Sequence, residues 1–349
     1  MELTPVQTCL ARPFSGMSKR RMLALALGLA ATFIATVPLR VAAQASEAAN
    51  YPNRPIRIIL GTAPGRSFDT SARMIADGLA KELGQAVVVD NQPGAGGVLG
   101  LKNMMTAKPD GYTLFYYWND LMTLTPWTYQ KPPYDPAKDV AHVGGALRTW
   151  GLVVAISANS PAKNFAEFVQ LAKASPGKLN YGSYGIGTAA HVHFEVMNAK
   201  AGIQLVHVPY KSGAAQTQAG LTGEVDVINS GGSIYPHIKS GRLRAIAVGG
   251  TLRSPEIPDV PTTAELGLGA ELFAPDAYGL VAPLGTPKPI LDKIREAVRK
   301  VVLVPEFAEK LRPMAIEPGP ATPDEVLARI KRETETNLAV IKRLKLDTN

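Results

Sequence analysis

Short apolar strand signals alternate with helical patterns through most of the chain, and this alternation is the strongest constraint on its fold. The first strand signal covers 55–60, and a glycine and proline turn separates it from a helical stripe of Ala72, Ile75, Ala76, Leu79 and Leu83. Further strand signals cover 86–89, 112–118, 152–156, 179–181, 205–208, 225–228 and 243–248. Such an order favours parallel sheets covered by helices, and eight strands are enough for two α/β lobes. The segment after Ile290 is predicted to be mostly helical.

The first 45 residues read as an export signal. A basic segment, Ser18–Arg21, precedes sixteen small apolar residues, Met22–Val37, and Ala43-Gln44-Ala45 supplies a small-x-small cleavage pattern. Sixteen helical residues span about 24 Å, short of the roughly 30 Å hydrocarbon layer, so a cleaved signal is favoured over an uncleaved anchor. We therefore expect a soluble periplasmic protein, exported through either the general or the twin-arginine route.

Charge and cysteine content exclude several classes of protein. The formal net charge is +8, but half of it lies in residues 1–45, and no run of Lys or Arg follows. No nucleic-acid partner is expected. The single cysteine, Cys9, precedes the expected cleavage point, which excludes disulfide scaffolds and cysteine zinc sites.

The first strand–helix junction, Gly61–Asp69, is the most informative segment. Glycine and proline build a turn, and Ser67 or Asp69 is placed to cap the following helix. Main-chain amides at a helix start attract an anion, so the junction predicts either an anion site or an ordinary capped helix.

A second junction, Tyr181–Thr188, repeats this design. Its glycines formally match a dinucleotide fingerprint from Gly185, but no acidic residue follows at the end of the next strand, so no nucleotide cofactor is expected. Ser183 lacks the first glycine of a nucleophile elbow, because Tyr181 occupies that place. On a helix, His191 and His193 would point in different directions, so we expect neither a metal site nor catalytic residues.

Large aromatic residues gather at the end of the strand at 112–118. In an open α/β sheet, ligands bind at the carboxyl ends of the strands. Trp118 and Asn119 are therefore candidate ligand contacts, with Tyr117 as part of the same flat wall.

Several motifs occur in order along the chain and carry a resemblance to a known family. They include Tyr51-Pro-x-Arg-Pro-Ile-Arg, Asp69-x-x-Ala-Arg73, Val89-Asp-Asn-Gln-Pro-Gly-Ala-Gly-Gly97, Lys108-Pro-Asp-Gly-Tyr112 and His207-Val-Pro-Tyr-Lys211. With them the sequence closely resembles the Bug/TctC family, the extracytoplasmic solute receptors of tripartite tricarboxylate transporters, over nearly all of 51–349.

The resemblance implies an α/β type II periplasmic-binding-protein fold whose two lobes close on a solute. One lobe would comprise 46–148 plus 272–349, and the other 149–271. In that family the two glycine-rich loops face each other and hold a ligand carboxylate through amides, hydroxyls and waters. The matching positions here are Thr62, Pro64, Gly65, Arg66, Ser67, Asp69, Ser183, Gly185, Gly187, Thr188, His191 and Tyr210. The chain departs from the family at Gly65-Arg66, where two glycines are usual, and at Tyr117-Trp118-Asn119, where small residues are common.

We therefore expect a non-catalytic receptor that delivers a small carboxylic acid to integral-membrane transporter subunits and needs no cofactor. Arg66 would bind a second carboxylate or stack on a ring, and with Trp118 it favours an aromatic, unsaturated or dicarboxylic solute. Two alternatives remain open. One is an exported enzyme that acts on a small acid with His191 or Ser183, and the other is a ligand sensor for a signalling system.

Overall fold

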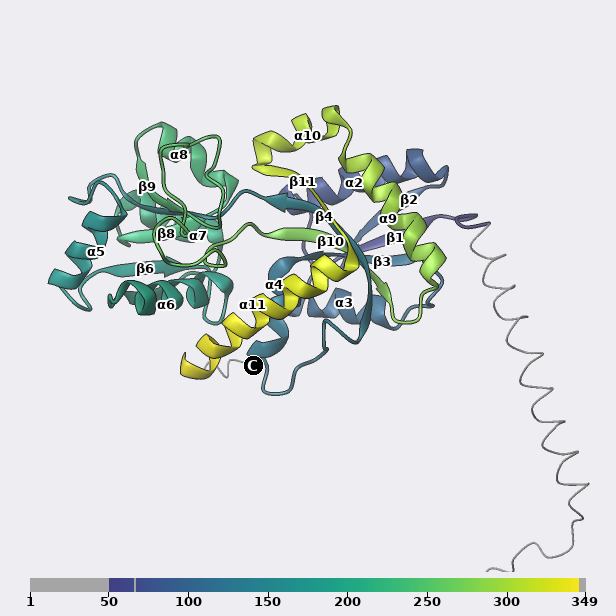
Figure 1. Ribbon diagram of the computed structural model, residues 1–349, viewed down its shortest axis with the longest axis horizontal. Helices are drawn as coiled ribbons and strands as arrows, with labels where there is room; N and C mark the ends of the chain where they lie inside the picture. The colour runs from purple at the N-terminus through teal and green to yellow at the C-terminus, as the bar shows by residue number, and fades with distance from the viewer. Residues whose placement is uncertain (1–49, 66, 345–349) are drawn as a thin grey trace, which may run out of the picture. The chain divides into compact units, whose positions relative to one another are not determined.

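The computed structural model describes residues 50–65 and 67–344, so the export signal and Arg66 lie outside the described residues. From residue 52 onward the chain forms one compact unit that contains two sheets (Figure 1). Within the described ranges, no helix is both long and apolar enough to cross a membrane.

The first sheet has six strands in the order β11-β4-β10-β3-β1-β2. Their bounds are β1 Ile56–Leu60, β2 Val87–Asn91, β3 Thr113–Trp118, β4 Val140–Thr149, β10 Ala277–Pro283 and β11 Ile316–Ala321. Strand β1 pairs in parallel with β2 and β3, whereas β10 runs antiparallel to β3 and β4, and β11 antiparallel to β4.

The second sheet has five strands in the order β7-β6-β8-β5-β9. Their bounds are β5 Val153–Ser157, β6 Asn180–Ser183, β7 Val206–Pro209, β8 Val227–Ser230 and β9 Leu243–Val248. Strand β6 is parallel to β7 and β8, and β5 is antiparallel to β8 and β9.

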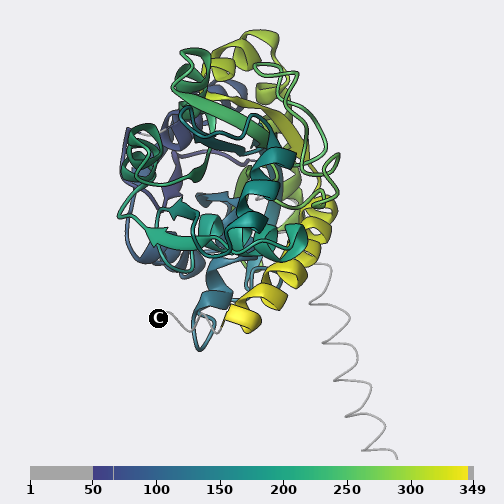
Figure 2. The same cartoon turned by 90° about the vertical axis from the view of Figure 1, so that its left-hand side faces the viewer.

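Helices cover both sheets and occupy most of the sequence between the strands (Figures 1 and 2). Their bounds are α2 Ser67–Leu83, α3 Val98–Met105, α4 Asn119–Thr123, α5 Phe165–Ala174, α6 Ala189–Ala201, α7 Gly213–Thr222, α8 Tyr235–Lys239, α9 Lys288–Val302, α10 Pro305–Leu311 and α11 Pro323–Leu344. The predicted apolar stripe of α2 is buried at Ala72, Ile75, Ala76 and Leu79.

The eight predicted strands are confirmed within two residues at each end, but the sheets are mixed, with antiparallel pairings beside the expected parallel ones. The strands that the sequence did not reveal, β4, β10 and β11, all join the first sheet in antiparallel pairings. Strand β4 contains Gly144-Gly145, and β11 contains Pro318-Gly319-Pro320, which are residues typical of turns. Tertiary pairing therefore overrides local propensity in this sheet.

Two chain segments connect the sheets and pair with each other. Thr149 donates its amide to the carbonyl of Asp276 at 2.8 Å, and Asp276 donates its amide to the Thr149 hydroxyl at 2.8 Å. Further along, the amide of Leu152 donates to the carbonyl of Phe273 at 2.9 Å. The segment between β4 and β5 is therefore hydrogen-bonded to the segment that precedes β10.

Helix α11 joins both cores. Its residues Val326 and Ile330 are buried in the cluster around Phe115 and Leu101 of the first sheet. Near its other end, Ile341 is buried in the cluster around β5 and β6 of the second sheet. Figures 1 and 2 show α11, in yellow, running from the first sheet to the side of α6, which it contacts.

The connecting segments approach so closely that side chains are excluded. A Cβ atom on Gly249 would lie 1.5 Å from the carbonyl oxygen of Phe273, and a Cβ on Gly151 would lie 1.8 Å from the carbonyl oxygen of Gly249. Only glycine permits this backbone contact at both positions.

We predict that Gly249→Ala lowers the free energy of unfolding by about 3 kcal/mol or more, because backbone must move to admit the methyl group. Gly213→Ala is the control, since nothing lies within 4 Å of its Cβ position in α7. That variant should be neutral or more stable by up to about 1 kcal/mol. Urea unfolding of both proteins tests this, and equal stabilities would contradict the prediction.

Candidate functional site

The first loop, 61–66, connects β1 to α2 and is fixed by a buried carboxylate. Asp69, 4% exposed, accepts hydrogen bonds from the Gly65 amide at 3.1 Å, from Asn91 Nδ2 at 2.9 Å and from Arg73 at 3.0 and 3.1 Å. Asn91 Nδ2 also donates to the carbonyl of Thr62 at 2.9 Å. Burial by itself raises the pKa of Asp69, but these donors hold the pKa below its usual value. Asp69 therefore braces the loop as a carboxylate.

Thr62, at the start of this loop, has an unusual buried hydroxyl. Its Oγ1 is buried and has no hydrogen-bond partner among the described residues. A buried hydroxyl normally finds a partner, so one left unpaired beside a loop is a candidate ligand contact. The structure does not describe Arg66, and Pro64 and Gly65 are exposed beside it.

An aromatic group lines the start of α2. Phe68 stacks on Tyr116 with ring centroids 4.8 Å apart, and it meets Trp118 and Tyr278 edge-on at 5.5 and 4.9 Å. Trp118 also packs on Gly97, where a Cβ would lie 2.2 Å from its ring. Sequence reasoning missed Phe68 and Tyr278, although Phe68 lies inside the junction that it singled out.

The expectation that Tyr117 forms part of a ligand wall is wrong. Its side chain is 0% exposed and belongs to the core cluster with Leu101 and Val326. Because the strand alternates its faces, Trp118 at its end points to the opposite side and remains half-buried.

The second loop, 184–188, is held by its own side chains. Ser183 Oγ accepts from the Gly185 amide at 3.1 Å, and Thr188 Oγ1 donates to the Gly185 carbonyl at 2.7 Å. The Gly187 amide donates to His191 Nδ1 at 3.1 Å. Gly185 and Gly187 have φ angles of 142° and 75°, which explains the need for glycine at both positions. The amides of these two glycines are therefore engaged within the loop.

Two histidines stack behind this loop. The rings of His191 and His207 lie 4.0 Å apart, and His207 also stacks on Tyr181 at 4.9 Å. Burial lowers the pKa of His191, and burial together with the charge of His191 lowers the pKa of His207 to about 4. Both rings are therefore neutral near pH 7, which allows close stacking.

Ser183 Oγ lies 2.6 Å from Nε2 of His207, which resembles a nucleophile and its base. Ser183 is 0% exposed, however, and a histidine with a pKa of about 4 is a weak base at neutral pH. The pair acts as a brace for the loop. In the described part of the chain, no group of three or more His, Cys, Asp or Glu is arranged to hold a metal ion.

Tyr210 contributes to the loop mainly through its backbone. Its amide donates to the carbonyl of Ser183 at 2.8 Å, while its hydroxyl donates to Glu224 at 2.9 Å. Burial and this carboxylate raise the pKa of Tyr210 to about 12.

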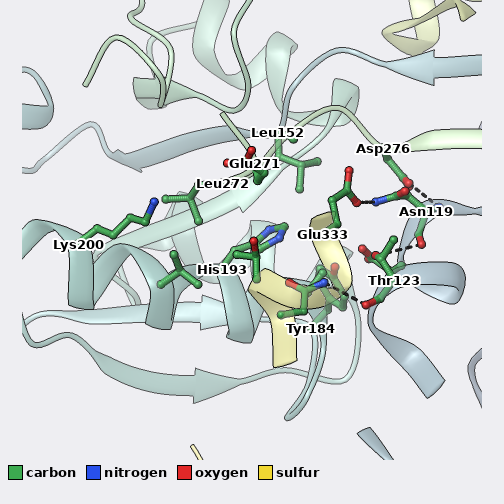
Figure 3. A pocket seen from close by; sticks show the side chains of 16 residues that line it. Asn119, Thr123, Leu152, Tyr184, His193, Lys200, Glu271, Leu272, Asp276 and Glu333 are labelled. Carbon is green, nitrogen blue, oxygen red and sulfur yellow. Dashed lines mark hydrogen bonds between the residues drawn. The ribbon is translucent and has the colours of Figure 1, made fainter. Parts of the chain in front are cut away.

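A pocket opens beside the second loop, bounded by α4, α6, α11 and the segment before β10 (Figure 3). It includes the predicted contact Asn119, Tyr184 from the second junction and Ala189, the first residue of α6. It also includes residues that the sequence did not suggest: Asp120, Thr123, Leu152, His193, Val196, Lys200, Glu271, Leu272, Ala274, Asp276, Glu333, Thr336 and Asn337. Asp276 and Glu333 belong to no sequence motif. They come together only in the fold, because Asp276 directly precedes β10 and Glu333 lies in α11.

Two mixed sheets joined by paired connections, with glycine-rich loops at strand ends, define a periplasmic-binding-protein fold. Residues 71–346 match the family model described as the tripartite tricarboxylate transporter family receptor. The chain belongs to this family of solute-binding receptors, as its motifs indicated.

Individual relatives agree with this assignment. The chain is 40% identical over 305 residues to the UPF0065 protein in the gbd 5'region of Cupriavidus necator, covering 86% of this chain and 90% of the relative. It is 29% identical to the periplasmic binding protein BugD, with a TM-score of 0.69 over 85% of this chain and 99% of BugD. It is also 26% identical to an R. palustris protein with adipate, with a TM-score of 0.72 over 84% and 98% of the two chains.

We predict that His207→Gln makes the protein less sensitive to acid. Because the folded pKa of His207 lies below that of an unfolded histidine, the unfolded chain binds a proton that the folded chain does not, and stability falls as the pH decreases from about 6.5 towards 4. Glutamine removes this contribution and keeps a polar partner for Ser183. Urea unfolding of both proteins near pH 7 and near pH 5 measures the loss. An equal loss in the two proteins would refute the prediction.

Proposed function

We propose that the chain is an exported, non-catalytic receptor that captures a small carboxylic acid between the loops at 61–69 and 183–188. It delivers the acid to the integral-membrane subunits of a tripartite tricarboxylate-type transporter. The capturing lobes are 46–148 plus 272–349 on one side and 149–271 on the other.

The buried hydroxyl of Thr62, which has no hydrogen-bond partner among residues 50–65 and 67–344, is the observation that carries this proposal. It lies just after the carboxyl end of β1, in a loop that the Asp69 carboxylate holds through hydrogen bonds from Gly65 and Asn91. A hydrogen bond to a charged group contributes roughly 1.5–3 kcal/mol. Four such bonds to one carboxylate would contribute roughly 6–12 kcal/mol in gross terms, against the roughly 8 kcal/mol of a micromolar complex and the cost of ordering the two loops.

Bound ligands of structural relatives support the same chemical class. The R. palustris protein mentioned above carries adipate, and MatC from Rhodopseudomonas palustris, 26% identical, has bound malate. Both ligands are small carboxylates. The half-buried ring of Trp118 beside Phe68 gives this chain a flat apolar surface near the first loop, which suits an aromatic or unsaturated acid.

Closure around the solute would use the paired connections as a hinge. The hydrogen bonds between Thr149 and Asp276 hold the two connections together, so they would bend as one element. Helix α11, which is anchored in both cores, would limit the range of that motion.

The second candidate function is an exported enzyme, for which the 2.6 Å contact between Ser183 and His207 speaks, against the burial of Ser183 and the low pKa of His207. Incubation of the purified protein with each acid that it binds separates the two. Product formation would identify an enzyme, whereas saturable binding at one site without product supports the receptor.

We predict that mono-, di- or aromatic carboxylates raise the melting temperature of the protein in a thermal-shift screen. For the best acid, Thr62→Val should weaken binding by about tenfold or more, because the hydroxyl bonds to the charged group. The same change should leave stability equal or higher, since it removes an unsatisfied buried hydroxyl.

Thr70→Val is the matched control, because Thr70 is exposed on α2. It should keep wild-type affinity in calorimetry. Unchanged affinity in Thr62→Val would remove Thr62 from the site, and a screen with no stabilising acid would overturn the receptor function.

A further inference from the structure

The pocket beside the second loop is lined by acidic side chains from three parts of the chain. Asp120 comes from α4, Asp276 and Glu271 from the segment before β10, and Glu333 from α11. The described residues do not arrange them as a metal site. Buried carboxylates are stable in their ionised form only when they are paired, so an organic cation is a candidate partner for them.

Asn119 supplies an independent sign that a hydrogen-bond donor belongs in the pocket. The residue is 8% exposed and lines the pocket, yet its Oδ1 is buried and has no partner among the described residues. Its other polar atoms are used, because Nδ2 donates to the Glu333 carboxylate and the main-chain amide donates to Asp276 Oδ1 at 2.8 Å. Figure 3 shows Asn119, Asp276 and Glu333 together at one side of the pocket.

Arg329 is the cation that approaches this group, and its charge offsets only part of the effect of burial on Asp276 and Glu333. Figure 3 shows Lys200 of α6 at the opposite side of the pocket from Asn119 and Asp276. Arg329 lies one helical turn from Glu333, with its Nε 4.0 Å from Glu333 Oε1, and is not among the residues that line the pocket. Because the pKa values of Asp276 and Glu333 stay raised despite Arg329, a further positively charged donor would stabilise their ionised forms.

We propose that this pocket holds an ammonium group of the solute against Asn119 Oδ1, Asp276 and Glu333, so that the solute is an amine-bearing carboxylic acid. The inference rests on the proposed function for the carboxylate end of the solute. The pocket and the loops adjoin, since Tyr184 belongs to the second loop, Ala189 follows it directly, and Asn119 follows Trp118. An ammonium group has three donors and no acceptor, which suits a site made of acceptors.

The protonation of the pocket supports this reading. Burial raises the pKa of Asp276 to about 7 against the opposing effects of the Asn119 amide and Arg329, and burial also raises the pKa values of Asp120 and Glu333. The other charged or titratable groups around them are Glu271, Lys200, His193, Arg332 and Tyr117. Because an ammonium group binds the ionised carboxylate, amine binding should release a proton and tighten as the pH rises through 7.

Matched ligands separate the amine from the carboxylate. Straight-chain acids of about three to six carbons are used in three forms: unsubstituted, with a terminal carboxylate and with a terminal ammonium group. Benzoate, terephthalate and 4-(aminomethyl)benzoate form the aromatic set, and alkylammonium ions of equal length lack the carboxylate. Calorimetry on the mature protein should show the aminated acid binding about 10- to 100-fold more tightly than its unsubstituted partner.

Two variants on α11 test the pocket itself. Glu333→Gln should remove about tenfold or more of the affinity for the aminated acid and leave the unsubstituted acid within about twofold. Glu335→Gln, two residues away and exposed, is the control and should bind both as the wild type does. Asp276→Asn should abolish the tightening of amine binding above pH 7, and melting curves confirm that each variant is folded.

The outcomes distinguish this inference from the proposed function. If unsubstituted or dicarboxylic acids bind as well as the aminated acid in every set, the ammonium site is wrong and the carboxylate receptor stands. If only alkylammonium ions bind, and Glu333→Gln weakens them, the ammonium site stands and the carboxylate function is wrong. If no ligand of any set binds, both are overturned.

Discussion

The close contact of main chain at Gly151, Gly249 and Phe273 is the constraint on which the rest of the structure depends. It places the two connections between the sheets so near each other that their amides and carbonyls pair directly. Asp276 belongs to this paired segment, so the same backbone that joins the sheets also positions a carboxylate of the acidic pocket. Any bending of the connections during closure would move that carboxylate relative to Glu333, which α11 carries.

The two glycine-rich loops are held in place by different hydrogen bonds. The first is held from outside by the ionised carboxylate of Asp69, which draws donors from Gly65, Arg73 and Asn91. The second is held from inside by neutral partners, with His191 accepting an amide and Ser183 bonding to His207. The Thr62 hydroxyl of the first loop has no partner in the described part of the chain, whereas the glycine amides of the second loop bond within that loop. The first loop is therefore the better prepared to receive an anion, and the second would have to exchange internal bonds for ligand bonds.

The acidic pocket and the first loop favour opposite charges. The Thr62 hydroxyl, which has no partner among the described residues, suits a negative group, while Asn119 Oδ1 and the carboxylates of Asp276 and Glu333 suit a positive one. A solute that satisfies both would be selected by the arrangement of its charges, since leaving either side unpaired costs free energy on burial. The residues that would select the positive group, Asn119, Asp276 and Glu333, lie outside the two glycine-rich loops.

The strand–turn–helix junctions, the two glycine-rich loops and the family could all be predicted from the sequence, because they depend on local patterns of apolar residues and glycine within short stretches. The sequence also placed Asn119 and Trp118 at a strand end, where a parallel sheet puts its binding edge. Three features could be seen only in the folded chain: Tyr117 is buried, β4, β10 and β11 pair antiparallel with their neighbours, and Asn119, Asp276 and Glu333 lie together. Those three residues are separated from one another by more than fifty positions along the chain. They meet because β10 and α11 return to the first sheet after the second sheet is complete. No local pattern encodes such a long-range pairing.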